Sequence, residues 1–114
     1  MSRTQWSLND IATNVASEIR RDYESTHSAQ DIMAMMFIGL SEEAGEVAGF
    51  YKRLLRNNER DKAQLSEDSQ MLEKELGDVL WYLAGIAYAM NIDLNEVWSI
   101  NRIKLEERYG DSSR

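Results

Sequence analysis

The chain has 114 residues, the size of one domain with a modest core that is small enough to form oligomers. It has no cysteine, which excludes disulfides, thiolate metal sites and cysteine nucleophiles and fits a cytoplasmic protein. With 20 Asp and Glu against 13 Lys and Arg, the formal net charge of −7 argues against a nucleic-acid partner. No apolar run is long enough for a membrane span or a signal peptide, so we expect a soluble protein without a membrane partner.

The first half of the chain predicts two helices. Proline is absent, glycine is sparse and apolar residues recur every three to four positions, which is typical of an all-α protein. The first helix is expected over about 8–23 with Ser7 as its N-cap. The second begins near residue 30 or 31, after a cap at Ser28, and carries its apolar stripe through Leu55.

The second half predicts two more helices after a polar segment. Residues 57–69 hold almost no apolar side chains and read as a loop. A helix follows over about 70–90. Asp93 and Glu96 resemble a capping box that opens the last helix, over about 94–109, and Gly110 ends it.

We expect these helices to form a four-helix bundle, or a close relative, as a single domain over residues 1–114. In the helix over 70–90, the stripe expected to face inward consists of Leu72, Leu76, Val79, Leu80, Leu83, Ile86 and Ala87. Trp81 lies opposite this stripe and Tyr88 lies close to the same side. An outward aromatic there favours an oligomer interface over a cofactor pocket.

Two pairs of acids carry the functional signal. Glu43 and Glu46 are spaced i,i+3 in the second predicted helix, and Glu75 and Asp78 repeat the spacing in the third. Residues i and i+3 differ by about 60° around a helix axis, so each pair projects from one face. Because like charges this close repel, the arrangement favours a bound divalent cation such as Mg²⁺ or Mn²⁺, which prefers hard oxygen ligands. The pairs occupy corresponding flanks and would face one another if the two helices run antiparallel.

The competing interpretation is that these acids only solvate outer helix faces, as most single glutamates do. The doubled spacing on matching flanks weighs against it. Gly45 and Gly77 lie inside the two motifs, and Gly85 lies further along the third helix. Each costs up to about 1 kcal/mol relative to alanine within a helix. Their small size would allow close approach of a ligand, although tight helix packing would explain them equally well.

A third group of polar residues lies on the last predicted helix. Asn101, Lys104 and Arg108 share one face at i, i+3 and i+7. Lys104 and Arg108 would reach phosphate oxygens, Arg108 in bidentate fashion. Alternatively, Asn101 bonds to a neighbouring helix and the two cations extend from the apolar surface to pair with acids. The residues alone leave both interpretations open.

Three runs of the sequence resemble the MazG-like, all-α nucleoside triphosphate pyrophosphohydrolases: EEAGE over 42–46, ELGD over 75–78 and NRIKLEERYGD over 101–111. The resemblance covers about residues 30–111. It implies metal-dependent hydrolysis of a nucleoside or deoxynucleoside triphosphate between the α and β phosphates, giving a monophosphate and pyrophosphate and cleaning the nucleotide pool. It also implies a homodimer or homotetramer with sites near the subunit contacts.

The resemblance also implies roles for individual residues. Glu43, Glu46, Glu75 and Asp78 would hold Mg²⁺, or Mn²⁺ in its place. Glu42 or Glu46 would orient or deprotonate the attacking water. The phosphate oxygens would be held by Asn101, Lys104 and Arg108, with help from Lys52, Arg53 or Arg56.

Two other functions compete with this one. Phosphoribosyl-ATP pyrophosphohydrolase of histidine biosynthesis shares the fold and the acidic motifs of the resembled family. A non-catalytic helical interaction module would keep the acids as a structural cation site. In that protein a divalent metal would raise the melting temperature without any turnover.

Overall fold

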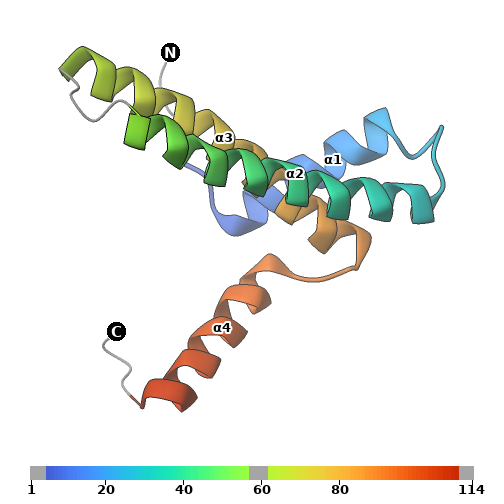
Figure 1. Cartoon of the computed structure of the whole chain (residues 1–114). Helices are drawn as coiled ribbons and strands as arrows, with labels where there is room; N and C mark the ends of the chain where they lie inside the picture. The colour runs from blue at the N-terminus through green and yellow to red at the C-terminus, as the bar shows by residue number, and fades with distance from the viewer. Residues whose placement is uncertain (1–4, 57–61, 111–114) are drawn as a thin grey trace.

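The computed structural model describes residues 5–56 and 62–110. It contains four helices, α1 (Leu8–Asp22), α2 (Ala29–Arg56), α3 (Lys62–Ala89) and α4 (Leu94–Tyr109), and no strand in the described ranges. The predicted all-α class is therefore confirmed. Figure 1 shows α2 and α3 side by side and antiparallel, α1 crossing them, and α4 extending away. None of the helices in the described ranges is long and apolar enough to cross a membrane.

Local capping chemistry sets the ends of α1 and α4 where the sequence predicts them. Ser7 and Asp10 form a reciprocal capping box: the Asp10 amide donates to Ser7 Oγ at 3.1 Å and the Ser7 amide donates to Asp10 Oδ2 at 3.0 Å. Asp93 caps α4 by accepting from the Asn95 amide at 2.8 Å, but among the described residues no bond from Glu96 to the Asp93 amide completes the predicted capping box. Gly110 ends α4 in the left-handed conformation with φ 68°, which glycine adopts without steric cost.

The start of α3 departs from the prediction. The helix begins at Lys62, inside the segment 57–69 that reads as a loop, and the rest of that segment before it lies outside the described residues. Residues 62–69 contain lysine, glutamine, leucine and glutamate, which are all good helix formers. A segment with few apolar residues lacks an amphipathic pattern but can still be helical. The prediction, which relied on that pattern, therefore placed the start of the helix eight residues late.

The hydrophobic core lies where α1 crosses the α2/α3 pair. Its buried members are Val15, Ile19, Ile32, Met36, Ala84, Ala87 and Leu94. Two glycines let the helices approach closely. A Cβ at Gly85 would overlap Met36 Sδ, and a Cβ at Gly39 would overlap the ring of Tyr82. The packing explanation for a helical glycine thus holds at these two positions.

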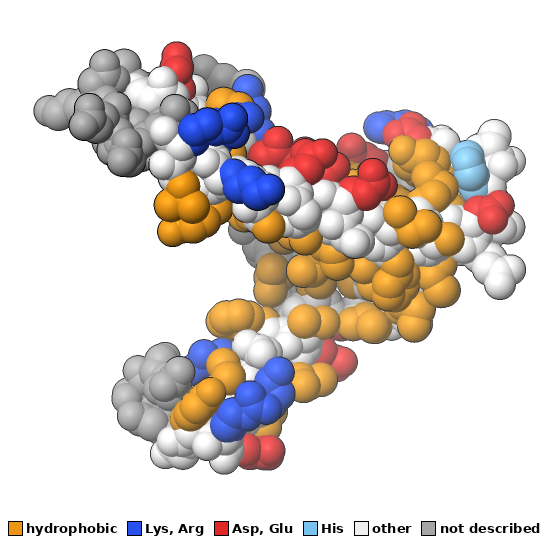
Figure 2. Space-filling view, viewed as in Figure 1, with side chains coloured by type: hydrophobic (Ala, Val, Ile, Leu, Met, Phe, Trp, Pro, Cys, Tyr) orange, Lys and Arg blue, Asp and Glu red, His pale blue; other side chains and the backbone are white. Residues whose placement is uncertain are grey.

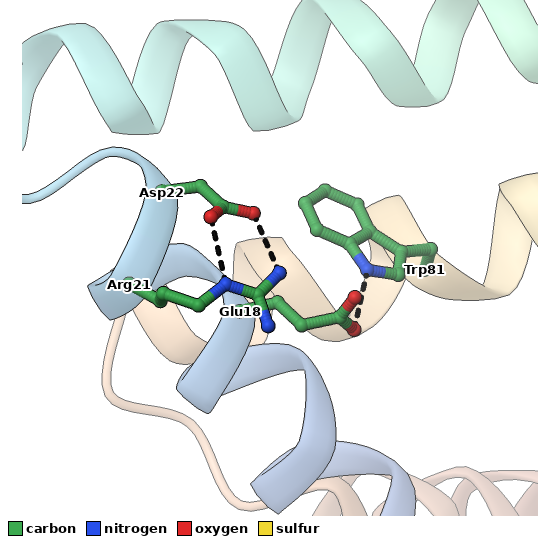
Figure 3. A network of polar contacts seen from close by, with 4 residues as sticks. All are labelled: Glu18, Arg21, Asp22 and Trp81. Atoms are coloured by element: carbon green, nitrogen blue, oxygen red, sulfur yellow. Dashed lines mark hydrogen bonds and ion pairs between the residues drawn. The ribbon is translucent and has the colours of Figure 1, made fainter.

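The core-facing side of α3 is only partly the predicted one, since Ala87 is buried and Ile86 packs against the core as expected, but the leucines do not. Leu76, Leu80 and Leu83 are 49%, 40% and 39% exposed, whereas Trp81 packs against the core. The Trp81 indole N–H donates to Glu18 Oε1 on α1 at 3.3 Å, beside an Arg21–Asp22 ion pair (Figure 3). The prediction of an outward Trp81 was therefore wrong. Apolar residues line two faces of α3, and periodicity alone does not say which face meets the chain's own core.

The four helices do not close into a bundle within one chain. Leu94, at the start of α4, is that helix's buried residue, and Asn95 Nδ2 donates to Asn9 Oδ1 on α1 at 2.6 Å. Beyond this first turn, α4 leads away from α2 and α3 (Figure 1). The arrangement is therefore more open than the predicted bundle, and Val97, Trp98, Ile100 and Ile103 of α4 remain exposed to solvent in the part of the chain that the structure describes.

Candidate metal centre on α2 and α3

Antiparallel packing of α2 and α3 brings the two acidic motifs together, as the sequence predicts. One carboxylate oxygen each from Glu43, Glu75 and Asp78 lies within 4.8 Å of the other two. Glu43 projects from α2, and the other two residues project from one flank of α3. Three of the four predicted metal ligands therefore form a single cluster, which we call the acid cluster.

Two oxygens of the acid cluster are buried without a partner. Among the described residues, neither Glu43 Oε2 nor Glu75 Oε2 has a hydrogen bond. A buried carboxylate oxygen that neither water nor a donor contacts is costly to the folded chain. A divalent cation coordinated by both oxygens would remove this cost and the repulsion among the three acids, so the residues fit a hard metal ion.

The pKa shifts of the acid cluster also favour a bound cation, because the carboxylates repel one another. Burial raises the pKa of Glu43, and the negative charges of Glu46, Asp78 and Glu42 raise it further. The pKa of Glu75 is raised by a hydrogen bond shared with the Glu46 carboxyl group, then by burial, and then by its acidic neighbours. When no cation is present, both carboxyl groups therefore keep a proton to a higher pH than an isolated glutamate does.

Glu46 and Glu42 border the acid cluster without belonging to it. Glu46 acts on Glu75 through the shared hydrogen bond and lines, together with Glu75, a cavity of about 250 Å³ between α2 and α3. Glu42 is exposed and acts on Glu43 through its charge. Of the two predicted candidates for activating water, Glu46 is thus the one that contacts the cluster and the cavity.

Tyr82 is a neighbour of the acid cluster to which sequence reasoning gave no role. Its ring is half-buried against Gly39, and burial raises the pKa of its hydroxyl, followed by the charge of Glu43. The phenol therefore stays protonated and is a neutral donor beside the carboxylates. Its position four residues after Asp78, one turn along the same face of α3, was the signal that would have identified it.

The predicted phosphate-binding residues do not reach the acid cluster in a single chain. Asn101 is half-buried on α4, and Lys104 and Arg108 are exposed on the same helix, which extends away from α2 and α3 (Figure 1). Lys52 is exposed on α2 and is absent from the lining of the cavity beside Glu46, whereas its neighbour Arg53 lines that cavity.

Gly45 and Gly77, inside the two acidic motifs, have different surroundings from Gly39 and Gly85, which allow close helix packing. A Cβ at Gly45 or Gly77 would meet no described heavy atom within 4 Å outside the backbone of its own helix. Tight helix packing therefore does not explain these two positions in the single chain. Of the two interpretations left open by the sequence, packing accounts for Gly85, and Gly45 and Gly77 border open space.

Antiparallel helices with facing carboxylate pairs and unpartnered buried oxygens define a helical protein with a candidate divalent-cation site. Residues 32–112 match the MazG nucleotide pyrophosphohydrolase domain, and the chain belongs to this family. The resemblance found in the three sequence runs is thereby confirmed. The chain is also similar to the Gene 37 protein of Mycobacterium phage L5, with 37% identity over 76 residues. That match covers 67% of this chain and 65% of the phage protein.

Proposed function

We propose that this protein is a metal-dependent nucleoside triphosphate pyrophosphohydrolase that cleaves NTPs or dNTPs into monophosphates and pyrophosphate. Membership in the MazG family supports the reaction class. The observation that carries the proposal is the pair of buried, unpartnered oxygens of Glu43 and Glu75 within the acid cluster. We assign Mg²⁺, or Mn²⁺ in its place, as the cofactor, and cleaning of the cytoplasmic nucleotide pool as the role.

In this proposal, the residues of the site have separate roles in binding the cation and accepting a proton. Glu43, Glu75 and Asp78 would hold the cation, with Glu46 at their border. When bound, Mg²⁺ neutralises triphosphate charge and lowers the pKa of a water molecule. Water attacks the α-phosphorus, the bond from that phosphorus to the α–β bridging oxygen breaks, and pyrophosphate leaves with that oxygen. We assign to Glu46 the proton released by the water, because it adjoins both Glu75 and the cavity.

We further propose that a second copy of the chain completes the protein. The exposed large apolar residues of α2 and α3 include Phe37, Tyr51, Leu55, Met71, Leu76, Leu80, Leu83 and Met90, and those of α4 include Val97, Trp98, Ile100, Ile103 and Tyr109. Figure 2 shows apolar side chains gathered along the side of the α2/α3 pair that faces α4, with open space between them. Monomeric proteins rarely expose so much contiguous apolar surface.

Self-association covers both apolar surfaces at once, because one copy's α4 can lie on the α2/α3 pair of the other in a symmetric dimer. In such a dimer we expect Asn101, Lys104 and Arg108 of one subunit to approach the acid cluster of its partner. Light scattering should give the mass of a dimer or tetramer. Leu83→Glu, which buries a charge in that interface, should reduce the mass to that of a monomer. A monomeric wild-type protein at micromolar concentration would contradict this assembly.

The experiment that tests the activity is pyrophosphate release from a panel of NTPs, dNTPs and phosphoribosyl-ATP, with Mg²⁺, with Mn²⁺ and with EDTA. Metal-dependent release from nucleoside triphosphates supports the proposal, and preference for phosphoribosyl-ATP would assign the related enzyme of histidine biosynthesis instead. No release from any compound, with Mg²⁺ still raising the melting temperature, would identify a structural cation site and overturn the proposal.

A further inference from the structure

A cavity of about 250 Å³ extends from the acid cluster along α2 and α3. It is lined by Glu46, Gly49, Phe50, Arg53, Met71 and Glu75. Glu46 and Glu75 supply negative charge, and Arg53 is the cation of the lining. The cavity therefore connects the proposed cation site to a guanidinium group, with an apolar wall of Phe50 and Met71 between the two helices.

Arg53 is held in this cavity by an aromatic ring and a thioether. Its guanidinium carbon lies 5.4 Å from the centroid of the Phe50 ring, and its Nη1 is 3.2 Å from Met71 Sδ. Phe50 is buried and belongs to α2, whereas Met71 belongs to α3, so the Arg53 side chain contacts both helices. Among the described residues, no carboxylate lies within ion-pair distance of Arg53, although the acid cluster is close by. Its planar fork of N–H donors thus stays available to an anion.

The spacing between Arg53 and the acids matches an extended polyanion. Arg53 follows Glu46 by seven residues, which is about two helical turns and about 10.5 Å along the axis. Two turns return to nearly the same face, which explains why both side chains line one cavity. A ligand that binds a cation at the acid cluster and also reaches Arg53 needs phosphate groups beyond the first one.

We propose that Arg53 binds the β and γ phosphates of the substrate, the part released as pyrophosphate, and so makes the site selective for triphosphates over diphosphates. This inference rests on the proposed pyrophosphohydrolase function. The guanidinium fork would donate to two phosphate oxygens in bidentate fashion, and these charge-assisted hydrogen bonds are among the stronger ones in proteins. A diphosphate lacks the outermost phosphate and would therefore make fewer hydrogen bonds to the Arg53 guanidinium. Arg53 is a specificity-determining residue in this scheme.

The test compares Arg53→Gln with the wild-type protein in two assays. Calorimetry with pyrophosphate and Mg²⁺ should show binding at least about tenfold weaker in the variant, the loss expected for one charge-assisted pair. In steady-state assays the ratio of kcat/KM for a triphosphate to that for its diphosphate should fall by about the same factor. Arg53→Lys should recover part of both losses, because it keeps the charge without the fork.

Arg21→Gln is the matched control, since it removes an exposed arginine from α1 whose ion pair is with Asp22. It should leave both measurements unchanged. Unchanged pyrophosphate binding and an unchanged triphosphate preference in Arg53→Gln would overturn the inference while leaving the proposed function standing. If the wild-type protein releases no pyrophosphate from any nucleotide, the proposed function fails separately. The calorimetric comparison then still decides whether Arg53 binds pyrophosphate.

Discussion

The acidic half and the basic half of the predicted site differ in how one chain builds them. Packing between α2 and α3 assembles the acid cluster from Glu43, Glu75 and Asp78. By contrast, Lys104 and Arg108 sit on α4, which leaves the other helices after its first turn (Figure 1). The difference teaches that a motif can be complete in the sequence while a single chain brings only part of it together. Charges in the two halves are complementary, which is what a shared site between copies requires.

The largest expected effect concerns the acidic half. Glu75→Gln should reduce Mg²⁺-dependent pyrophosphate release by at least about a hundredfold, because a neutral amide oxygen is a poorer ligand than a carboxylate and the metal no longer binds well. Helical circular dichroism should stay as in the wild type, because the amide has the same shape. Glu73→Gln, an exposed acid on the same helix, is the matched control and should retain full activity. Full turnover by Glu75→Gln would remove the acid cluster from the mechanism.

The next largest effect tests whether the basic half comes from a partner. Lys104→Ala should lower kcat/KM by about tenfold or more through loss of a charged phosphate contact. Mixed with Glu75→Gln subunits, it should recover about a quarter of wild-type activity, because half of the dimers are mixed and one of their two sites is intact. Co-expression with two affinity tags isolates the mixed dimers, which should then show about half of wild-type activity. Activity that never exceeds the mean of the two parents would place both halves in the same subunit.

Sequence patterns specified the parts of the fold that local chemistry controls. Ser7, Asp93 and Gly110 cap helices through hydrogen bonds and backbone preferences within a few residues, so their positions could be predicted. The i,i+3 acids could be placed on one flank of each helix for the same reason, and antiparallel packing of α2 and α3 was enough to bring three of them together.

Sequence periodicity did not predict which face of α3 packs against the other helices. The leucines of α3 form the more continuous stripe, yet small Ala84 and Gly85 allow the closer approach of α1 and α2 and lie at the core. Leu80 is left exposed and Trp81 is turned inward, which no single-chain periodicity distinguishes. Gly39, whose lack of a side chain admits Tyr82, gave no signal because its neighbour lies in a distant part of the sequence.

A smaller expected effect is a pH dependence of stability that comes from the acidic half and not from the basic half. Glu43 and Glu75 have raised pKa values in the folded chain, so between the usual value of 4.5 and the raised values the folded state binds more protons than the unfolded state. The free energy of unfolding of the metal-free protein should therefore fall as pH rises through this window. Mg²⁺ should oppose the fall and add about 2.7 kcal/mol at a hundred times its Kd.

Melting curves with Mg²⁺ and with EDTA, taken from about pH 4 to pH 8, measure this dependence around the ordinary carboxyl pKa. Glu75→Gln should flatten the pH dependence of the metal-free protein and abolish the gain from Mg²⁺. Lys104→Ala on α4 should leave the gain from Mg²⁺ intact, because the basic half does not hold the cation. An equal gain in wild type and Glu75→Gln would show that Mg²⁺ stabilises the chain elsewhere.

The smallest expected effect comes from the glycine inside the second acidic motif. Gly77→Ala should stabilise the protein by about 0.5–1 kcal/mol, since alanine favours a helix and its Cβ enters open space. That space is a mostly apolar cavity shared with Trp6 and Trp81, and its lining includes no residue of the acid cluster, so turnover should stay unchanged. Gly39→Ala is the contrasting variant: its Cβ would overlap Tyr82, and overpacking of this kind costs about 1–3 kcal/mol. A more stable Gly77→Ala protein that has lost turnover would show that a substrate or a partner subunit occupies the space beside Gly77. The acidic half, like the basic half, would then be incomplete in a single chain.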